Sequence, residues 1–531
     1  MTATTSRPAT AAARTPALGG FGRLLHAEWT KFRTVRGWTW SAVGALLVIC
    51  AVGLLATAPG SKAGHDGAGL PVGPGGEAVN DSFAFVHQEL RGDGTLTVAV
   101  SALTGEIQRG PGESGGGLAP WAKAGIIVKD GLGQGSGYAA VMVTGAHGVR
   151  MQYDYTHDRA GAAGAPAPAS PRWLRLRRTG GTITGYQSAD GTRWTEIGAV
   201  RPARLPATAQ VGLFVTSPSI GTGTGTGMGF SPAAATGTFG HVALSGGWSG
   251  DGWQTGRVGS NAGTSASYGD SFPGPEAVRT GGGSGGGPGS GSGGGFKVTG
   301  AGDIAPVVGG QAGSGVRTIE NFLVGAFAGL IIMAVVGAGS VTAEYRRGLI
   351  GVTLAASPRR ARVLVAKALV VGGVGFVAGA VAAAVIVPFG GARSQANGFP
   401  VLTVPAMTEL RVMAGTGLLL AVAGVLALAV GTIVRRGAVA ITVVVVGMVL
   451  PYLLASGSVL PDGASQLLLR VTPAAGFAIQ QSVVRYGQVF TDYGPSSGYF
   501  PLAPWAGFAV LCGYAAVAFA AATVLLRRRD V

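Results

Sequence analysis

The sequence contains few charged residues and very little cysteine. Only 12% of its 531 residues are charged, about half the fraction usual in soluble globular proteins, whereas 47% are apolar and 96 are glycine. Both cysteines, Cys50 and Cys512, lie inside apolar runs, which excludes a disulfide framework in the long segment between them and a metal site built on thiolates. This composition indicates membrane helices combined with glycine-rich strand or linker sequence.

Two kinds of chemical motif are also absent. No G-x-x-x-x-G-K-[ST] sequence, the phosphate-binding loop of ATPases, occurs, so any ATP hydrolysis must come from another chain. The apolar runs have no acidic residue near their centres, which argues against an ion-coupled carrier with its own charged site. We therefore expect no catalytic residues, no metal site and no cofactor in this chain.

Long apolar runs occur near the N-terminus and again after residue 321. The six runs cover residues 38–58, 322–341, 368–389, 412–434, 438–457 and 505–526. At about 1.5 Å per helical residue, each run can cross the roughly 30 Å hydrocarbon core of a bilayer. The sequence predicts six transmembrane helices, the first an uncleaved anchor. A cleaved signal peptide remains the alternative, because Ala56-Thr57-Ala58 resembles a signal-peptidase site.

The net charge of +16 is concentrated beside these runs. Arginine and lysine gather in every second connection: the N-terminal segment, residues 342–367, residues 435–437 and the C-terminal tail. This positive-inside pattern predicts a multi-pass cell-membrane protein with both termini in the cytoplasm and residues 59–320 outside. It also argues against nucleic-acid binding, because the basic residues follow the membrane spans and form no continuous basic face.

Residues 1–37 are expected to form a cytoplasmic segment that contains an amphipathic interfacial helix. Its apolar stripe includes Phe21, Leu24, Leu25, Trp29 and Phe32, and it is interrupted by one acidic residue. The residues expected to matter at the membrane interface are Glu28, Trp29, Lys31 and Arg33. An ordinary juxtamembrane anchor is the alternative. Near the other end of the chain, residues 466–489 predict two short helices, which either dip into the outer leaflet or lie on the surface.

Two cytoplasmic motifs point to a family. Ala343-Glu344-Tyr345-Arg346-Arg347-Gly348 is followed by Ser357-Pro358-Arg359-Arg360 and an apolar span, and Ala27-Glu28-Trp29-Thr30-Lys31 lies in the expected amphipathic helix before the first span. In this order, and with six spans, the sequence resembles bacterial ABC-2 type transporter permeases. The resemblance implies a half-channel that pairs with a second permease, as a homodimer or with a related chain. It also implies two cytoplasmic ABC ATPase subunits, which would bind ATP and Mg²⁺.

In that family the loop between the second and third spans docks on the ATPase. Carried over to this sequence, the docking or coupling residues are Glu344, Tyr345, Arg346, Arg347, Arg359 and Arg360. The alternative is that the arginines only satisfy the positive-inside rule and that Glu344 pairs with them locally.

Between the first and second spans the sequence has the period-two pattern of β-strands. Strands are expected at 96–100, 123–128, 138–143, 149–155, 174–177, 182–187, 194–200, 210–216 and 238–244, with turns at Gly180-Gly181 and Asp190-Gly191. Many short strands with frequent turns predict an antiparallel sandwich over residues 81–250. Residues 59–80 and the Gly/Ser-rich residues 251–320 are expected to be linkers, and residues 321–531 complete the permease with five helices.

The sandwich region resembles the concanavalin A-like lectin/glucanase group. The likeness rests on Trp121-Ala122-Lys123-Ala124-Gly125, Trp173-Leu174-Arg175-Leu176 and Ser188-Ala189-Asp190-Gly191-Thr192-Arg193-Trp194. Members bind glycans, cleave them or serve as scaffolds. No Glu-x-Asp-x-x-Glu run supplies the two carboxylates of a retaining glucanase, so hydrolysis is not expected. Trp121, Trp173, Tyr186 and Trp194 could stack on a cell-wall glycan, although such tryptophans are more often core residues.

The fold class predicted is therefore an α-helical membrane protein with six transmembrane helices and an inserted extracellular antiparallel β-sandwich, a jelly roll of the concanavalin A-like type. The function predicted is that of an ABC-2 type permease subunit that exports an unidentified substrate across the membrane, powered by a separate ATPase. The alternative is a membrane-anchored extracellular protein that binds glycan or senses it.

Overall fold

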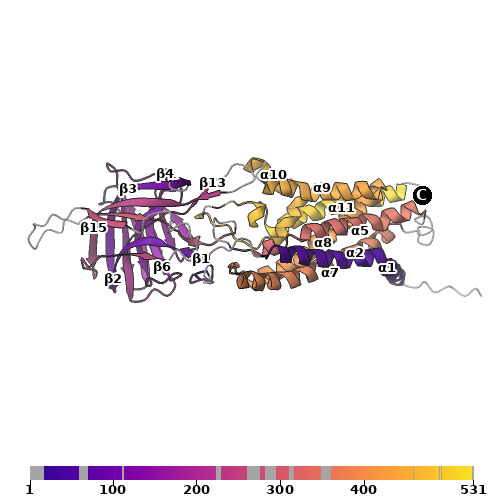
Figure 1. The fold of residues 1–531 in the computed structure, drawn as a ribbon, viewed down its shortest axis with the longest axis horizontal. Coiled ribbons are helices and arrows are strands. Elements are labelled where there is room, and N and C mark those ends of the chain that lie inside the picture. Colours follow the sequence, from indigo (N-terminus) through magenta and orange to yellow (C-terminus); the bar gives the residue numbers. More distant parts are fainter. Residues whose placement is uncertain are drawn as a thin grey trace, which may run out of the picture.

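The computed structural model describes residues 17–58, 70–110, 113–222, 229–259, 276–280, 295–309, 316–348, 360–457, 460–489, 491 and 493–528. A helical bundle and a β-sandwich follow one another along the long axis of the molecule (Figure 1). Helix α1 (Ala17–Thr34) and the C-terminal end of α11 (Pro504–Arg528) lie at the end of the bundle that is far from the sandwich.

Six helices in the described part of the chain are long and apolar enough to cross a membrane. They are α2 (Arg36–Leu55), α5 (Ala326–Arg346), α7 (Arg360–Ala396), α8 (Ala406–Val434), α9 (Gly437–Ser456) and α11. Each contains or overlaps one of the predicted spans, which confirms a multi-pass membrane protein. α5 and α8 are mostly buried, whereas α2, α9 and α11 leave most of their apolar residues on the outside of the bundle, where lipid replaces water.

Small residues allow the central helices to approach one another closely. A Cβ atom added to Gly337 of α5 would lie 2.1 Å from the carbonyl oxygen of Gly424 in α8. A Cβ atom on Gly379 of α7 would meet the Cα atom of Gly417 in α8 at 2.9 Å. Lipid removes the hydrophobic force between helices, so these close backbone contacts are a main source of packing energy here.

Residues 462–480 form the expected pair of short helices, but the second enters the bundle. α10 (Asp462–Val471) is followed by the 3₁₀ helix η1 (Pro473–Gln480). Phe477 is buried, with its ring centroid 4.7 Å from that of Phe327 and 5.2 Å from that of Tyr452. The Gln480 side-chain amide donates a 3.0 Å hydrogen bond to the Thr416 hydroxyl, so the polar end of η1 is also satisfied inside the protein.

Two antiparallel sheets make the sandwich. The strand order in the eight-stranded sheet is β11 (Thr195–Val200), β10 (Thr182–Ser188), β9 (Arg172–Thr179), β3 (Gly94–Gly110), β15 (Ala233–Gly246), β18 (Gly295–Gly300) and β17 (Glu276–Thr280). The eighth strand, β4 (Glu113–Gly116), pairs with β3. In the other sheet the order is β16 (Gln254–Val258), β2 (Phe83–Arg91), β12 (Thr208–Thr216), β5 (Lys123–Lys129), β6 (Tyr138–Thr144), β7 (Val149–Tyr153) and β8 (His157–Ala160). Leu96, Val98 and Leu174 from the first sheet meet Ile126, Val141 and Leu213 from the second in the core. A two-sheet sandwich is therefore confirmed, whereas its concanavalin A-like type stays a prediction.

The sequence pattern predicted that the sandwich ends at residue 250, but the structure continues it beyond that residue. β16 pairs with β2, β18 pairs with both β15 and β17, and β1 (Val79–Asp81) pairs with β19 (Ile304–Pro306). The expected linker 251–320 therefore supplies strands to both sheets. The reason is that short strands such as β18, in which Phe296, Val298 and Gly300 are buried, lie next to Gly/Ser-rich sequence that hides their alternation. Residues 59–69, 260–275, 281–294 and 310–315 of the expected linkers lie outside the described residues.

A two-stranded ribbon, formed by β1 and β19, joins the sandwich to the bundle. It covers the outer face of the seven-stranded sheet, where Lys123 and Lys129 of β5 are completely buried. The Lys123 ammonium lies 2.7 Å from the Asp303 carboxylate, and the Lys129 ammonium lies 2.7 Å from that of Asp81. Figure 1 places β1 at the end of the sandwich nearest the helices.

The same junction also contacts the segment that follows η1 in the chain. The predicted strand 149–155 ends at Tyr153, and Tyr155 turns away with a φ of 58° to donate a 2.7 Å hydrogen bond to Asp81. The Gln488 amide, which follows η1 in the chain, donates a 3.1 Å hydrogen bond to the Tyr155 carbonyl oxygen. Val308 of the ribbon segment packs in a cluster with Val489. The sandwich is thus packed directly against the end of the bundle that lies far from α1.

Candidate functional site

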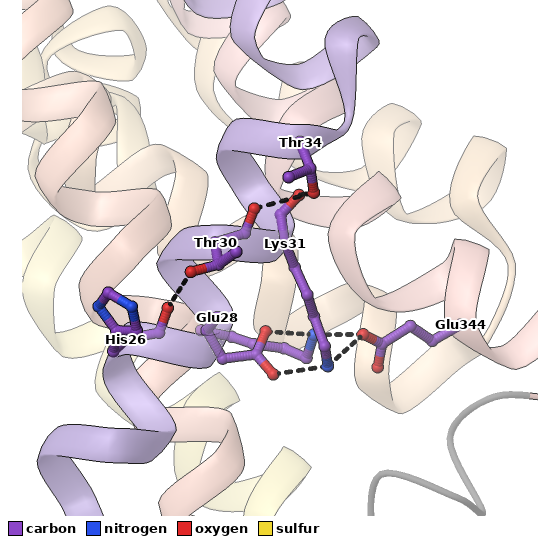
Figure 2. A network of polar contacts seen from close by, with 7 residues as sticks. His26, Glu28, Thr30, Lys31, Thr34 and Glu344 are labelled. Atoms are coloured by element: carbon purple, nitrogen blue, oxygen red, sulfur yellow. Dashed lines mark hydrogen bonds and ion pairs between the residues drawn. The ribbon is translucent and has the colours of Figure 1, made fainter.

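Four charged side chains from three helices meet at the end of the bundle far from the sandwich. The Lys367 ammonium of α7 lies 2.8 Å from a Glu28 carboxylate oxygen of α1 and 2.6 Å from a Glu344 oxygen of α5. The Lys31 ammonium lies 2.9 Å from Glu28 and 3.5 Å from Glu344. Figure 2 shows Glu28 and Lys31 on α1 directed toward Glu344. We call these four residues the four-charge cluster.

Local sequence explains how α1 presents two members of this cluster. Glu28 and Lys31 are three residues apart, so they lie on neighbouring positions of the same helical face. Phe32 is buried on that face too, with its ring centroid 6.0 Å from that of Trp38 in α2. The acidic residue that interrupts the apolar stripe of α1 is therefore its buried contact to α5 and α7. Glu28 is 5% exposed.

Electrostatics inside the cluster are balanced, with two carboxylates and two ammonium groups. Glu28, Glu344 and Lys367 are nearly excluded from solvent, and the side chain of Lys31 is 40% exposed. Burial lowers the pKa of Lys31, but its hydrogen bonds and attraction to Glu28 and Glu344 outweigh burial, and the net pKa is raised above its usual value. One Glu344 oxygen is buried without a hydrogen-bond partner among the described residues.

The remaining docking candidates lie around this cluster. Arg346 and Arg347 are exposed at the end of α5, and the Arg435 guanidinium carbon lies 4.9 Å from the ring centroid of Tyr345. Arg360, at the start of α7, donates a 2.8 Å hydrogen bond to the Leu526 carbonyl oxygen near the end of α11. Arg359 lies outside the described residues. The structure thus brings the candidates to one end of the bundle but divides them into buried contacts and exposed positive charge.

The interfacial candidates on α1 divide in the same way. Glu28 and Lys31 join the four-charge cluster, whereas Trp29 is 44% exposed and Arg33 is exposed. The Trp29 ring stacks on Phe32 with centroids 6.2 Å apart, so the outer aromatic residue rests on the buried one. α1 is therefore docked on α7 through one face and presents Trp29 and Arg33 outward, as a helix at a membrane surface does.

The glycan-binding candidates do not form one site. Trp121 is 5% exposed and stacks on His147, with ring centroids 3.8 Å apart, so it is a buried residue. Trp173, Tyr186 and Trp194 are half-buried, and they lie on β9, on β10 and in the turn after β10. Three of the four candidates therefore share the outer side of the eight-stranded sheet.

Sequence reasoning missed three of the lysines that form buried ion pairs, Lys123, Lys129 and Lys367. It treated Lys367 as part of the positive-inside charge and gave no role to Lys123 or Lys129. A usable signal was present, because only 6 of the 39 basic residues are lysine. Four of them, Lys31, Lys123, Lys129 and Lys367, form ion pairs in the described part of the chain.

Comparisons with solved structures give only partial likenesses. A functionally unknown protein from Saccharomyces cerevisiae is 15% identical, with a TM-score of 0.18, over 30% of this chain and 72% of its own. Two structures of scytalido-glutamic peptidase, each with a transition-state analogue, are 10% and 11% identical, with TM-scores of 0.26 and 0.23, over 43% of this chain and all of theirs. With TM-scores this low, none of these likenesses supports an argument about fold or function. No curated protein matches the chain.

A family model agrees with the helical architecture. The model described as ABC-2 family transporter protein matches residues 152–531, which is well over half of the chain. The match includes five of the six apolar helices and Glu344 and Lys367 of the four-charge cluster. The chain therefore belongs to the ABC-2 transporter family, whose members are the membrane subunits of ABC transporters.

Proposed function

We propose that this chain is the permease subunit of an ABC exporter, and that a separate ATPase drives it through the end of the bundle that carries the four-charge cluster. The functional unit holds two permeases, this chain with a second copy or a related chain, and two ATPase subunits that bind ATP and Mg²⁺.

One observation supports the coupling role most directly. Lys367 is bonded to both Glu28 and Glu344, so α1, α5 and α7 meet at a single ammonium group. Arg346 and Arg347 follow Glu344 immediately and are exposed. A partner that binds these arginines therefore pushes on a helix end that is tied to two other helices, and the movement is passed into the bundle.

Charge distribution supports the orientation that we propose. Exposed arginines flank the four-charge cluster at the end of α5 and at the end of α11, and the sandwich lies beyond the opposite end. The positive-inside bias then places α1 and both termini in the cytoplasm and the sandwich outside the cell. A single cysteine introduced at Thr192 should react with an impermeant thiol reagent in intact cells, whereas one at Arg527 should be protected. The reverse pattern would overturn the orientation.

ATPase docking can be tested with charge reversal and a matched control. The chain is expressed with the ATPase encoded nearest to its gene, and co-purification and ATPase stimulation are measured. Wild-type protein should retain the ATPase, and the double variant Arg346→Glu, Arg347→Glu should lose it. Arg393→Glu, an exposed charge near the other end of α7, should behave as wild type. A wild-type protein that binds no ATPase would refute the proposal.

Simple anchoring explains the bundle less well. The helices share two buried clusters, one around Leu419 and Phe477 and one around Met333 and Leu420. An anchor needs one apolar helix, whereas this arrangement buries most of α5 and α8 inside protein. A glycan-binding or sensing role for the sandwich can add to transport, but it does not account for the bundle.

A further inference from the structure

The outer side of the eight-stranded sheet has a hollow of about 580 Å³. Arg175 and Arg177 of β9, Tyr186 of β10 and Trp194 of the following turn line it, together with Thr95 of β3. These strand residues alternate with Leu174, Leu176 and Ile183, which point into the core. The hollow is therefore built by side chains that the pleat directs outward.

Several side-chain hydrogen-bond donors in this hollow have no acceptor among the described residues. Among the described residues, Arg177, the Tyr186 hydroxyl and the Trp194 indole N–H make no hydrogen bond, and Arg175 uses only its Nε–H, which donates a 3.1 Å bond to Thr97. The one carboxylate in the lining, Asp93, already accepts a 2.7 Å hydrogen bond from the Gly180 amide. The hollow thus offers donors and positive charge in excess of acceptors.

Aromatic and cationic groups are also held in fixed positions. The Arg175 guanidinium carbon lies 3.7 Å from the ring centroid of Trp194. Partial burial lowers the pKa of Arg175, which indicates that its guanidinium has lost part of its hydration. The turn that carries Trp194 is closed by Asp190, whose carboxylate accepts 2.8 Å hydrogen bonds from the Thr192 and Arg193 amides. Arg175 and Trp194 are thus held in place before a ligand binds, which lowers the entropy cost of binding.

The ring systems and the guanidinium groups favour different parts of one ligand. Aromatic side chains contribute apolar area to the faces of sugar rings, and guanidinium groups bind carboxylate or phosphate oxygens through charge-assisted hydrogen bonds. A neutral sugar would leave the free donors of Arg177 without a charged partner. An anion without a ring would leave Tyr186 and Trp194 unused.

We propose that this hollow is a binding site for an acidic saccharide, a sugar ring that bears a carboxylate or a phosphate group. The site uses Tyr186 and the face of Trp194 that Arg175 does not cover as the ring platform, and Arg175 and Arg177 as the anion contacts. It lies on the outer face of the eight-stranded sheet, whereas the β1–β19 ribbon covers the outer face of the seven-stranded sheet, so the ribbon leaves it open. The site is independent of the proposed ATPase coupling.

Binding can be measured on the purified full-length chain in nanodiscs by calorimetry. The probes are an oligogalacturonate for the carboxylate, a sugar phosphate for the phosphate, a neutral maltooligosaccharide of matched length, and inorganic phosphate alone. One or both acidic saccharides should bind, and binding should weaken as salt is raised because the charges are screened. Neutral sugar and free phosphate should bind at least tenfold more weakly.

Arg177→Gln is the decisive variant because its side chain is exposed and the change leaves the core intact. It should weaken binding of the acidic saccharide at least about tenfold, as expected for loss of a charge-assisted hydrogen bond. Arg193→Gln, a neighbouring exposed arginine outside the hollow, is the matched control and should bind as wild type. Absence of acidic-saccharide binding, equal binding of the neutral sugar, or equal effects of the two substitutions would overturn the proposal.

Discussion

Replacing Lys367 with methionine tests the four-charge cluster directly. Methionine keeps most of the length of the side chain but cannot donate a hydrogen bond or carry charge. The variant leaves Glu28 and Glu344 buried with Lys31 as their only cation in the cluster, and Lys31 lies 3.5 Å from Glu344. The cluster then carries one uncompensated negative charge in a site that is nearly closed to solvent.

The expected cost follows from that burial. Removing one partner of a buried ion pair costs about 3–5 kcal/mol, because the charge that remains has neither water nor a counterion. For a helical domain of roughly 200 residues, 1 kcal/mol corresponds to about 2–4 °C in Tm. Lys367→Met should therefore lower Tm by about 6–12 °C, taking the lower limit of the energy.

Thermal unfolding of the purified chain, followed by tryptophan fluorescence, measures this shift. The control is Lys297→Met, which removes an exposed lysine from β18 and should change Tm by less than about 1 °C. Adding Glu344→Gln to Lys367→Met removes the excess negative charge and should recover part of the loss, with a coupling energy of about 1–3 kcal/mol. Equal shifts for the two lysines, or strictly additive effects in the double variant, would refute the reasoning.

Three further predictions concern the rest of the molecule. The raised pKa of Lys31 implies a stabilising contribution that is complete below pH 10.5 and lost as pH rises through the folded value; Lys31→Met should remove this part of the alkaline fall in Tm. Gly337→Ala should separate α5 from α8 and lower Tm by several degrees, whereas Gly339→Ala, with nothing within 4 Å, should not. Asp303→Asn leaves Lys123 buried without its counterion, and should cost about 3–5 kcal/mol and expose the ribbon to limited proteolysis.

Strands that bury one face and helices that cross lipid could be predicted, because each of these environments leaves a regular pattern in the sequence. β9 and β10 each bury one face, so apolar and polar residues alternate along them. β5 and β6 are also buried on both faces, but their continuous apolar residues still mark them as strands. β2 was missed because its residues 83–88 are buried on both faces, so alternation is absent, and His87 and Gln88 interrupt the apolar run. β16 to β19 were missed for a related reason, since short strands between glycine-rich segments provide too few residues for a period to be seen.

The residues of the candidate site could be predicted from the sequence more readily than the contacts between them. Glu344 and Glu28 could be selected from motifs in the sequence, but Lys367 lies eight residues into a helix whose first turns resemble ordinary positive-inside charge. Nothing in the spacing of these residues indicates that one ammonium would serve both carboxylates. Such a contact depends on how three helices cross, which is a property of packing and not of local sequence.

Lysine and arginine are used differently in this chain, and the difference follows from geometry. The lysines at 123, 129 and 367 are buried with carboxylates, where one compact ammonium can bond oxygens that approach from different elements. Arginines such as Arg346 and Arg177 remain on surfaces, where a planar guanidinium can meet an external carboxylate or phosphate. The buried lysine contacts therefore join separate elements at two places: Lys367 ties α7 to α1 and α5, and Lys123 and Lys129 tie β5 to the β1–β19 ribbon and the residue before β19.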